Sequence, residues 1–133
     1  MTLITVFATI GLVGLVAGVF ALRFISRVRR SGEAPPHWHR LRCTTLVFGA
    51  LLGIGSWPLT FWLGYPIVTP EGPGRIVGLP FFVAFFDSAG RDYVGSVTLL
   101  GCIANLAFWF MVPQVIAALY GARWRRRRRQ GIA

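Results

Sequence analysis

Long runs of apolar residues without any charge dominate the hydropathy pattern of the chain. They cover residues 3–22, 43–65 and 93–120. An α-helix rises about 1.5 Å per residue, so each run is long enough to cross a hydrocarbon core of roughly 30 Å. The pattern therefore predicts an all-α membrane protein with three transmembrane helices in one integral domain, residues 1–133. No arginine or lysine precedes the first run, which favours a retained span over a cleaved signal peptide.

The connections between these runs differ in charge. Six arginines lie in the loop 23–42 and six in the tail 121–133, whereas the loop 66–92 has two. Because arginine near the end of a span is retained on the cytoplasmic side, we expect the first loop and the C-terminus inside and the N-terminus outside. Aromatic residues near both predicted boundaries are typical of interfacial belts. The outer belt is Trp57, Trp62, Tyr65 and Tyr93, and the inner belt is Trp38, Tyr120 and Trp124.

The composition agrees with a membrane protein. Of the 133 residues, 55% are hydrophobic and only 14% are charged, which is about half the charge that a soluble domain of this size carries. The net charge of +10 comes from 14 arginines without a single lysine. Arginine in place of lysine is typical of GC-rich coding, so we expect the protein in the plasma (inner) membrane of a bacterium.

Small residues recur four positions apart within the predicted spans. Gly14 and Gly18 in the first span, and Gly49 and Gly53 in the second, give each helix a strip where another backbone can approach closely. We expect these strips to pack against other helices of the same chain. The alternative is that they mediate self-association or bind another membrane protein.

Polar side chains are rare within the spans, and none of them is Asp, Glu, Lys, Arg or His. This argues against proton-coupled and cation-coupled carriers, which usually keep an ionisable residue at membrane depth. Asn105 lies near the middle of the third span and is predicted to pack by hydrogen-bonding to another helix. In the alternative interpretation it lines a narrow polar path together with Ser96, Thr98 and Gln114.

The loop 66–92 contains an apolar stretch, residues 76–86, that is too short to cross a bilayer. Its four phenylalanines are Phe81, Phe82, Phe85 and Phe86. Burying one phenylalanine gains roughly 1.5 to 3 kcal/mol, so leaving four in water would forfeit several. We therefore predict that the stretch is buried as an interfacial helix on the outer leaflet, as a re-entrant segment shielded by the spans, or against a partner protein.

Residues with metal-binding chemistry are few. His37 and His39 flank Trp38 in the first basic loop, with Cys43 close by, but a metal site needs more ligands than these. We interpret the triplet as an interfacial tryptophan among lipid headgroups. Cys43 and Cys102 lie at opposite depths and are predicted to be free thiols. The sequence predicts neither a metal nor a cofactor.

A run of arginines directly follows the third span. A negatively charged leaflet attracts each such arginine by about 1 kcal/mol, so we expect the tail to contact anionic lipids of the bilayer. Nucleic acid is not an expected partner, because no folded basic domain presents these residues. They are Arg123, Arg125, Arg126, Arg127, Arg128 and Arg129.

The sequence has no constellation that would support catalysis. It lacks a nucleophile with an adjacent base, paired carboxylates at helical spacing, a phosphate-binding loop and a dinucleotide fingerprint, so we expect no enzymatic activity. The leading hypothesis is a small multi-pass membrane protein that serves as an accessory or structural subunit, packed against other membrane proteins or against itself. The alternative is an oligomeric transporter or channel for a neutral or anionic small solute.

Overall fold

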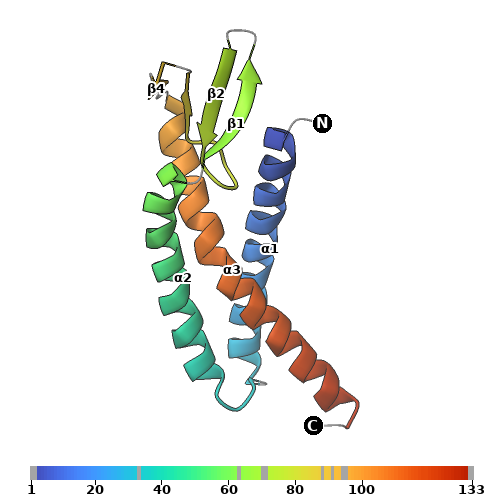
Figure 1. Cartoon of the computed structure of the whole chain (residues 1–133). Helices are drawn as coiled ribbons and strands as arrows, with labels where there is room; N and C mark the ends of the chain where they lie inside the picture. The colour runs from blue at the N-terminus through green and yellow to red at the C-terminus, as the bar shows by residue number, and fades with distance from the viewer. Residues whose placement is uncertain are drawn as a thin grey trace.

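The computed structural model describes residues 3–32, 34–62, 64–69, 72–87, 89–90, 92–93 and 96–131. Three long helices and a small sheet follow one another in the order α1, α2, β1, β2, β3, β4, α3 (Figure 1). The helices are α1 (Leu3–Ser31), α2 (Trp38–Trp62) and α3 (Ser96–Arg129). The strands are β1 (Gly64–Thr69), β2 (Gly72–Val77), β3 (Ala84–Phe86) and β4 (Asp92–Tyr93).

Two of the helices extend well beyond the uncharged runs, into the arginine-rich segments. α1 continues to Ser31 and α3 to Arg129, because arginine is a good helix former and a basic last turn complements the negative end of the helix dipole. Gly32 follows α1 with a φ of 67°, the left-handed conformation that commonly ends a helix. The basic loop is therefore shorter than predicted, and much of it is helical.

A tight turn joins α1 to α2. The N–H of Trp38 donates to the C=O of Pro35 at 3.0 Å, and His37, with a φ of 69°, occupies the third position of this turn after Pro36. Proline followed by a residue with positive φ is the pattern of a type II turn. The turn reverses the chain and starts α2 at Trp38.

α3 is the central helix of the molecule. Both α1 and α2 pack along it, one on each side in Figure 1. The end of α1, the start of α2 and the end of α3 lie together at one end, which we call the basic end, and the sheet lies at the other. By length and composition α1 and α3 could each cross a membrane, over Ile4–Ser31 and Thr98–Arg129. The fold is therefore mostly helical, with two candidate spans.

The prediction of an all-α fold is wrong at the sheet end, where four antiparallel strands pair in the order β1-β2-β3-β4. Residues 67–69 are β-branched and favour a strand. Pro66 and Pro73 argue against a strand in the sequence, because proline has no N–H to donate to a neighbouring strand. Pro73 pairs with a residue of β1, whereas β3 pairs only with residues 75–77. The proline thus lies where β2 has a single neighbour.

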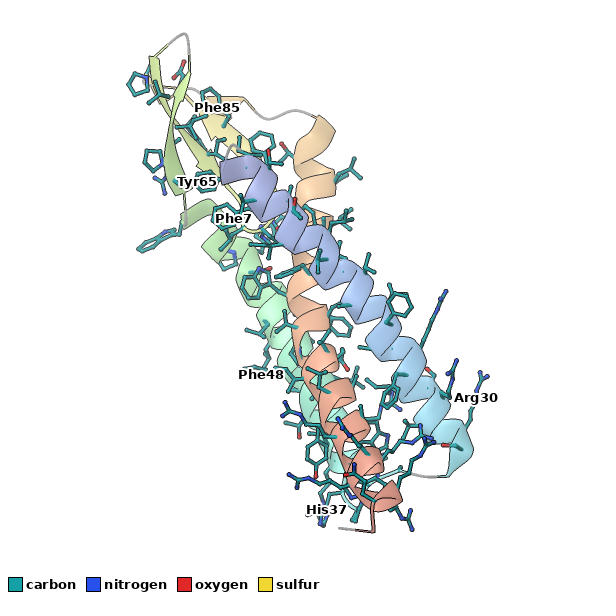
Figure 2. All side chains as sticks on the ribbon, turned by 90° about the vertical axis from the view of Figure 1, so that its right-hand side faces the viewer. Phe7, Arg30, His37, Phe48, Tyr65 and Phe85 are labelled. Carbon is teal, nitrogen blue, oxygen red and sulfur yellow. The ribbon has the colours of Figure 1, made fainter. Side chains whose placement is uncertain are left out.

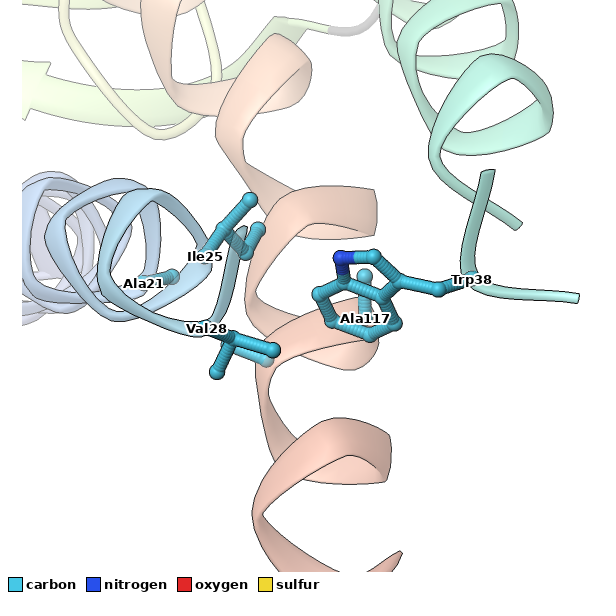
Figure 3. Packing of buried hydrophobic residues seen from close by; sticks show 6 residues of the cluster. Ala21, Ile25, Val28, Trp38 and Ala117 are labelled. Atoms are coloured by element: carbon cyan, nitrogen blue, oxygen red, sulfur yellow. The ribbon is translucent and has the colours of Figure 1, made fainter. Parts of the chain in front are cut away.

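A hydrophobic core lies near the basic end, between the three helices (Figure 3). Trp38 is only 6% exposed and packs with Val28 of α1 and Ala117 of α3. Gly121 of α3 makes room for it, because a Cβ there would lie 2.9 Å from the indole ring. The prediction that Trp38 sits among lipid headgroups is therefore wrong. The turn at His37 places the Trp38 side chain at the start of α2, where α3 covers it.

Candidate functional site: a hairpin loop held by the central helix

The connection between β2 and β3 leaves the sheet and packs against the helices. The N–H of Val83 donates to the C=O of Val77 at 2.9 Å and closes this hairpin loop. The ring of Phe81 reaches α1 at Gly11, while the backbone of the loop is hydrogen-bonded to α3. We call residues 79–83 the docked segment.

Asn105 of α3 binds the middle of the docked segment through both ends of its amide. Its Oδ1 accepts a hydrogen bond from the N–H of Phe81 at 2.8 Å, and its Nδ2 donates to the C=O of Phe81 at 2.9 Å. The Asn105 side chain is 1% exposed. One buried amide therefore satisfies both backbone groups of one loop residue, as a neighbouring β-strand would.

Two further side chains of α3 complete the hydrogen-bonding surface. The Thr98 hydroxyl donates to the C=O of Val83 at 2.7 Å, and the indole Nε1 of Trp109 donates to the C=O of Leu79 at 3.0 Å. These residues lie seven positions before and four positions after Asn105, so all three share one face of the helix. That face therefore hydrogen-bonds to the irregular backbone of the docked segment.

Glycines let the docked segment approach the helices. Gly101, on the same face of α3, lies directly against the carbonyl oxygen of Phe82, where any Cβ would collide with it. Gly11 of α1 would place a Cβ 2.6 Å from the Phe81 ring. Gly78 has a φ of 118°, and any Cβ there would meet the carbonyl oxygen of Phe81. The close contact on both sides therefore requires residues without a side chain.

The hydrogen bonds of this site supply what irregular backbone needs in apolar surroundings. Backbone N–H and C=O groups without partners each cost several kcal/mol in hydrocarbon, so irregular backbone is tolerated there only when protein groups satisfy it. Asn105 lies nine residues into α3 from Ser96, roughly 14 Å along the helix axis. The site thus holds a non-helical segment beside α3, well inside the helix rather than at its first turn.

The phenylalanine-rich stretch is partly covered by the chain itself. Phe81, Phe82, Phe85 and Phe86 are all half-buried, and Val83 between them is fully buried. Of the three arrangements expected from the sequence, the interfacial helix is not the one found, because the stretch consists of the end of β2, a loop and β3. It corresponds instead to a segment shielded by helices.

The partner of Asn105 differs from the one predicted. Sequence reasoning assigned its amide to another helix, but it binds the docked segment, and the contributions of Gly101 and Trp109 were not recognised. A signal was present: Thr98, Gly101, Asn105 and Trp109 form one stripe of polar, small and amphipathic residues along an apolar helix. An Asn on such a stripe indicates that something other than a smooth helix packs there.

The small residues singled out in the spans lie against α3 in two different ways. A Cβ on Gly14 would collide with the ring of Phe108, and one on Gly18 would lie 2.6 Å from the side chain of Met111. On the other side, a Cβ on Gly49 would lie 2.8 Å from the carbonyl oxygen of Phe110, and one on Gly53 would lie 3.3 Å from that of Leu106. The glycines of α2 therefore pack against the backbone of α3, whereas the glycines of α1 pack against side chains of α3.

Three further buried polar residues of the helices, Thr45, Ser56 and Gln114, are also hydrogen-bonded. Gln114 of α3 is 2% exposed, and its Nε2 donates to the C=O of Thr45 in α2 at 2.9 Å. The hydroxyls of Thr45 and Ser56 donate within α2, to the carbonyls of Arg42 and Gly53. Of the four side chains considered for a polar path, Thr98, Asn105 and Gln114 bond to this chain's own backbone. The side chain of Ser96 lies outside the described residues.

At the basic end the tail is the last part of α3. Arg123 and residues 126–129 are exposed. The guanidinium of Arg125 lies 6.0 Å from the ring of Phe24, and that of Arg128 lies 5.2 Å from the ring of Trp124. Among the described residues no three His, Cys, Asp or Glu side chains come together as a metal site would require. Cys43 and Cys102 are both free thiols.

An aromatic contact joins α1 to the sheet. The rings of Phe7 and Tyr65 lie 5.5 Å apart, where the start of α1 meets β1 (Figure 2). Burial raises the pKa of the Tyr65 hydroxyl above its ordinary value of 10.0, so the phenol is neutral at physiological pH. The contact therefore contributes packing rather than charge.

No known protein family, curated protein or solved structure matches this chain.

Proposed function

We propose that the chain is a three-span integral membrane protein that acts as an accessory or structural subunit without catalytic activity. One observation carries this proposal. The buried polar side chains among the described residues are Thr45, Ser56, Asn105 and Gln114. Each of them makes a hydrogen bond to this chain's own backbone. The polar groups at helix depth thus serve the architecture of the protein, and none of these four is left to bind a solute or a substrate.

The surface of the helices supports a membrane location. Large apolar side chains are exposed on all three, including Phe20 of α1 (64%), Ile54 of α2 (68%) and Leu100 of α3 (67%). Continuous apolar surface of this kind is costly in water and is expected to contact lipid or another protein. α2 has the same kind of exposed apolar surface as α1 and α3, the two candidate spans. We therefore propose that α2 also crosses the membrane.

Charge supports one threading through a bacterial plasma membrane. The arginine-rich ends of α1 and α3 lie at the same end of the molecule as the start of α2 (Figure 2). Positive residues beside spans are retained in the cytoplasm. We therefore place the basic end and the C-terminus inside, the sheet outside, and the exposed tail arginines against anionic lipids.

A reporter that is active only outside the cytoplasm tests this threading. Fused after Gln130, it is expected to give no signal, and inserted at Gly72, the first residue of β2, it is expected to be active. The reverse pair of results would refute the topology, and activity at both positions would show that α3 does not cross the membrane.

Purification from the native membrane in a mild detergent tests the subunit role. We expect the chain to copurify with an unrelated membrane protein at a fixed stoichiometry, or with a second copy of itself, without making liposomes permeable. A homo-oligomer that makes liposomes permeable to a small neutral or anionic solute would overturn the proposal and favour a channel. In that case Asn105 and Gln114 would have to exchange their internal hydrogen bonds for contacts with the solute.

A further inference from the structure

A basic cavity opens between the end of α1 and the start of α2. It has a volume of about 780 Å³ and is lined by Arg29 of α1, by Arg40 and Arg42 of α2, and by His37 and His39. This volume is within the range of sites for small molecules. The cavity exists because α1 and α2 each pack on α3, and the short turn between them leaves space beneath it.

Two arginines from different helices define the centre of this region. Arg29 and Arg42 line the large cavity and also a neighbouring one of about 380 Å³, to which Ser26 and Arg30 contribute. They therefore border both spaces and can reach a group placed in either. Arginine is the side chain best suited to bind phosphate oxygens, because its planar group offers several donors at once.

No carboxylate balances this positive charge in the part of the chain that the structure describes. The acidic residues there are Asp87 and Asp92, both at the sheet end, and Glu33 and Glu71 lie outside the described residues. The start of α2 adds the positive end of a helix dipole at the cavity, where first-turn N–H groups favour an anion. Positive charges held close together raise the energy of the site, and a bound anion would lower it.

The cavity is amphipathic. Leu46 lines it on the side toward the membrane, and Ala50, one turn further along α2, is exposed. A polar group held by the arginines could therefore continue into an apolar chain lying along α2. Basic pockets between membrane helices on the cytoplasmic side are suited to acidic lipid headgroups.

We infer that this cavity binds a phosphate group, supplied by the headgroup of an anionic phospholipid of the inner leaflet. Arg29 and Arg42 hold the phosphate oxygens, and the acyl chains lie along the apolar surface of α2. The site is separate from the tail arginines Arg125, Arg126 and Arg129, which line a smaller cavity of about 510 Å³ between α1 and α3. The lipid as the source of the phosphate rests on the membrane location proposed above.

Native mass spectrometry of the full chain in a mild detergent tests the inference, with phosphatidylglycerol, phosphatidylcholine and inorganic phosphate as the probes. We expect one phosphatidylglycerol to be retained in preference to phosphatidylcholine. The double variant Arg29→Gln/Arg42→Gln is expected to bind it about thirtyfold more weakly, roughly fivefold for each arginine. The control Arg23→Gln/Arg27→Gln removes the same charge from exposed positions of α1 that line neither cavity, and it is expected to change binding less than threefold.

Three results would overturn the site or its ligand. Equal weakening in both double variants would show diffuse attraction instead of a site. Equal retention of the two lipids would show that the site does not select an anionic headgroup. Displacement of the lipid by millimolar inorganic phosphate would assign the site to a soluble anion and overturn the lipid source. Flotation of each variant with vesicles reports membrane insertion separately, so loss of insertion is distinguishable from loss of the site.

Discussion

Replacing Gly101 by leucine is expected to lift the docked segment off α3. Even a Cβ at this position collides with the carbonyl oxygen of Phe82, and backbone cannot move aside as a flexible side chain can. Four hydrogen bonds hold the segment to the helix, each contributing about 1 kcal/mol net. A displaced segment would lose most of them, so we expect the equilibrium to shift by several kcal/mol toward an open loop.

Thiol labelling reads out this displacement. Val83 is fully buried beside Gly101, so Val83→Cys, in a chain with Cys43 and Cys102 replaced by alanine, is expected to react slowly with a membrane-impermeant reagent added from outside. Adding Gly101→Leu is expected to raise the labelling rate at least tenfold. The matched control is Gly55→Leu, because a Cβ on Gly55 meets nothing within 4 Å. Equal labelling rates in the two variants would show that the segment is not seated on Gly101.

The positions of the helices followed from the sequence because hydropathy is a local property. The uncharged runs located all three helices. The helical ends rich in arginine were harder to place, since charge signals the membrane boundary but does not end a helix. A span and the helix that contains it therefore have different limits, as the extension of α3 to Arg129 illustrates.

The sheet and the docked segment depend on contacts between distant residues. Phe81 and Asn105 lie 24 positions apart, and neither residue alone identifies the other as its partner. The cost of exposing four phenylalanines predicted that they would be covered, but it did not indicate what covers them. The stripe of Thr98, Gly101, Asn105 and Trp109 was visible in the sequence. It becomes a site only once the β2–β3 hairpin brings a loop beside it.

Trp38 illustrates the opposite error, in which a general tendency gave the wrong answer. A tryptophan beside a predicted boundary most often lies at the interface. Here the turn formed by Pro36 and His37 starts α2 directly at Trp38, and Gly121 leaves room for the ring against α3. The same turn leaves the basic cavity open between α1 and α2. One local geometry thus explains both the buried core and the charged cavity next to it.

Replacing Gly49 and Gly53 together by leucine is expected to separate α2 from α3. A Cβ on Gly49 would lie 2.8 Å from the carbonyl oxygen of Phe110, and one on Gly53 would lie 3.3 Å from that of Leu106. Overpacking costs about 1 to 3 kcal/mol at each site. The hydrogen bond from Gln114 to the carbonyl of Thr45 would also break, leaving a buried amide without its partner at a further cost of about 1 to 3 kcal/mol.

Accumulation in the membrane, migration in a mild detergent and thermal unfolding measure this effect. The double variant is expected to accumulate poorly and to unfold at a clearly lower temperature than the parent, because losses of this size are comparable with the stability of a small domain. Gly55→Leu, on the same helix but in open space, is expected to behave as the parent does. If the double variant accumulates, migrates and unfolds like Gly55→Leu, then Gly49 and Gly53 face lipid, and α2 does not pack on α3 through these glycines.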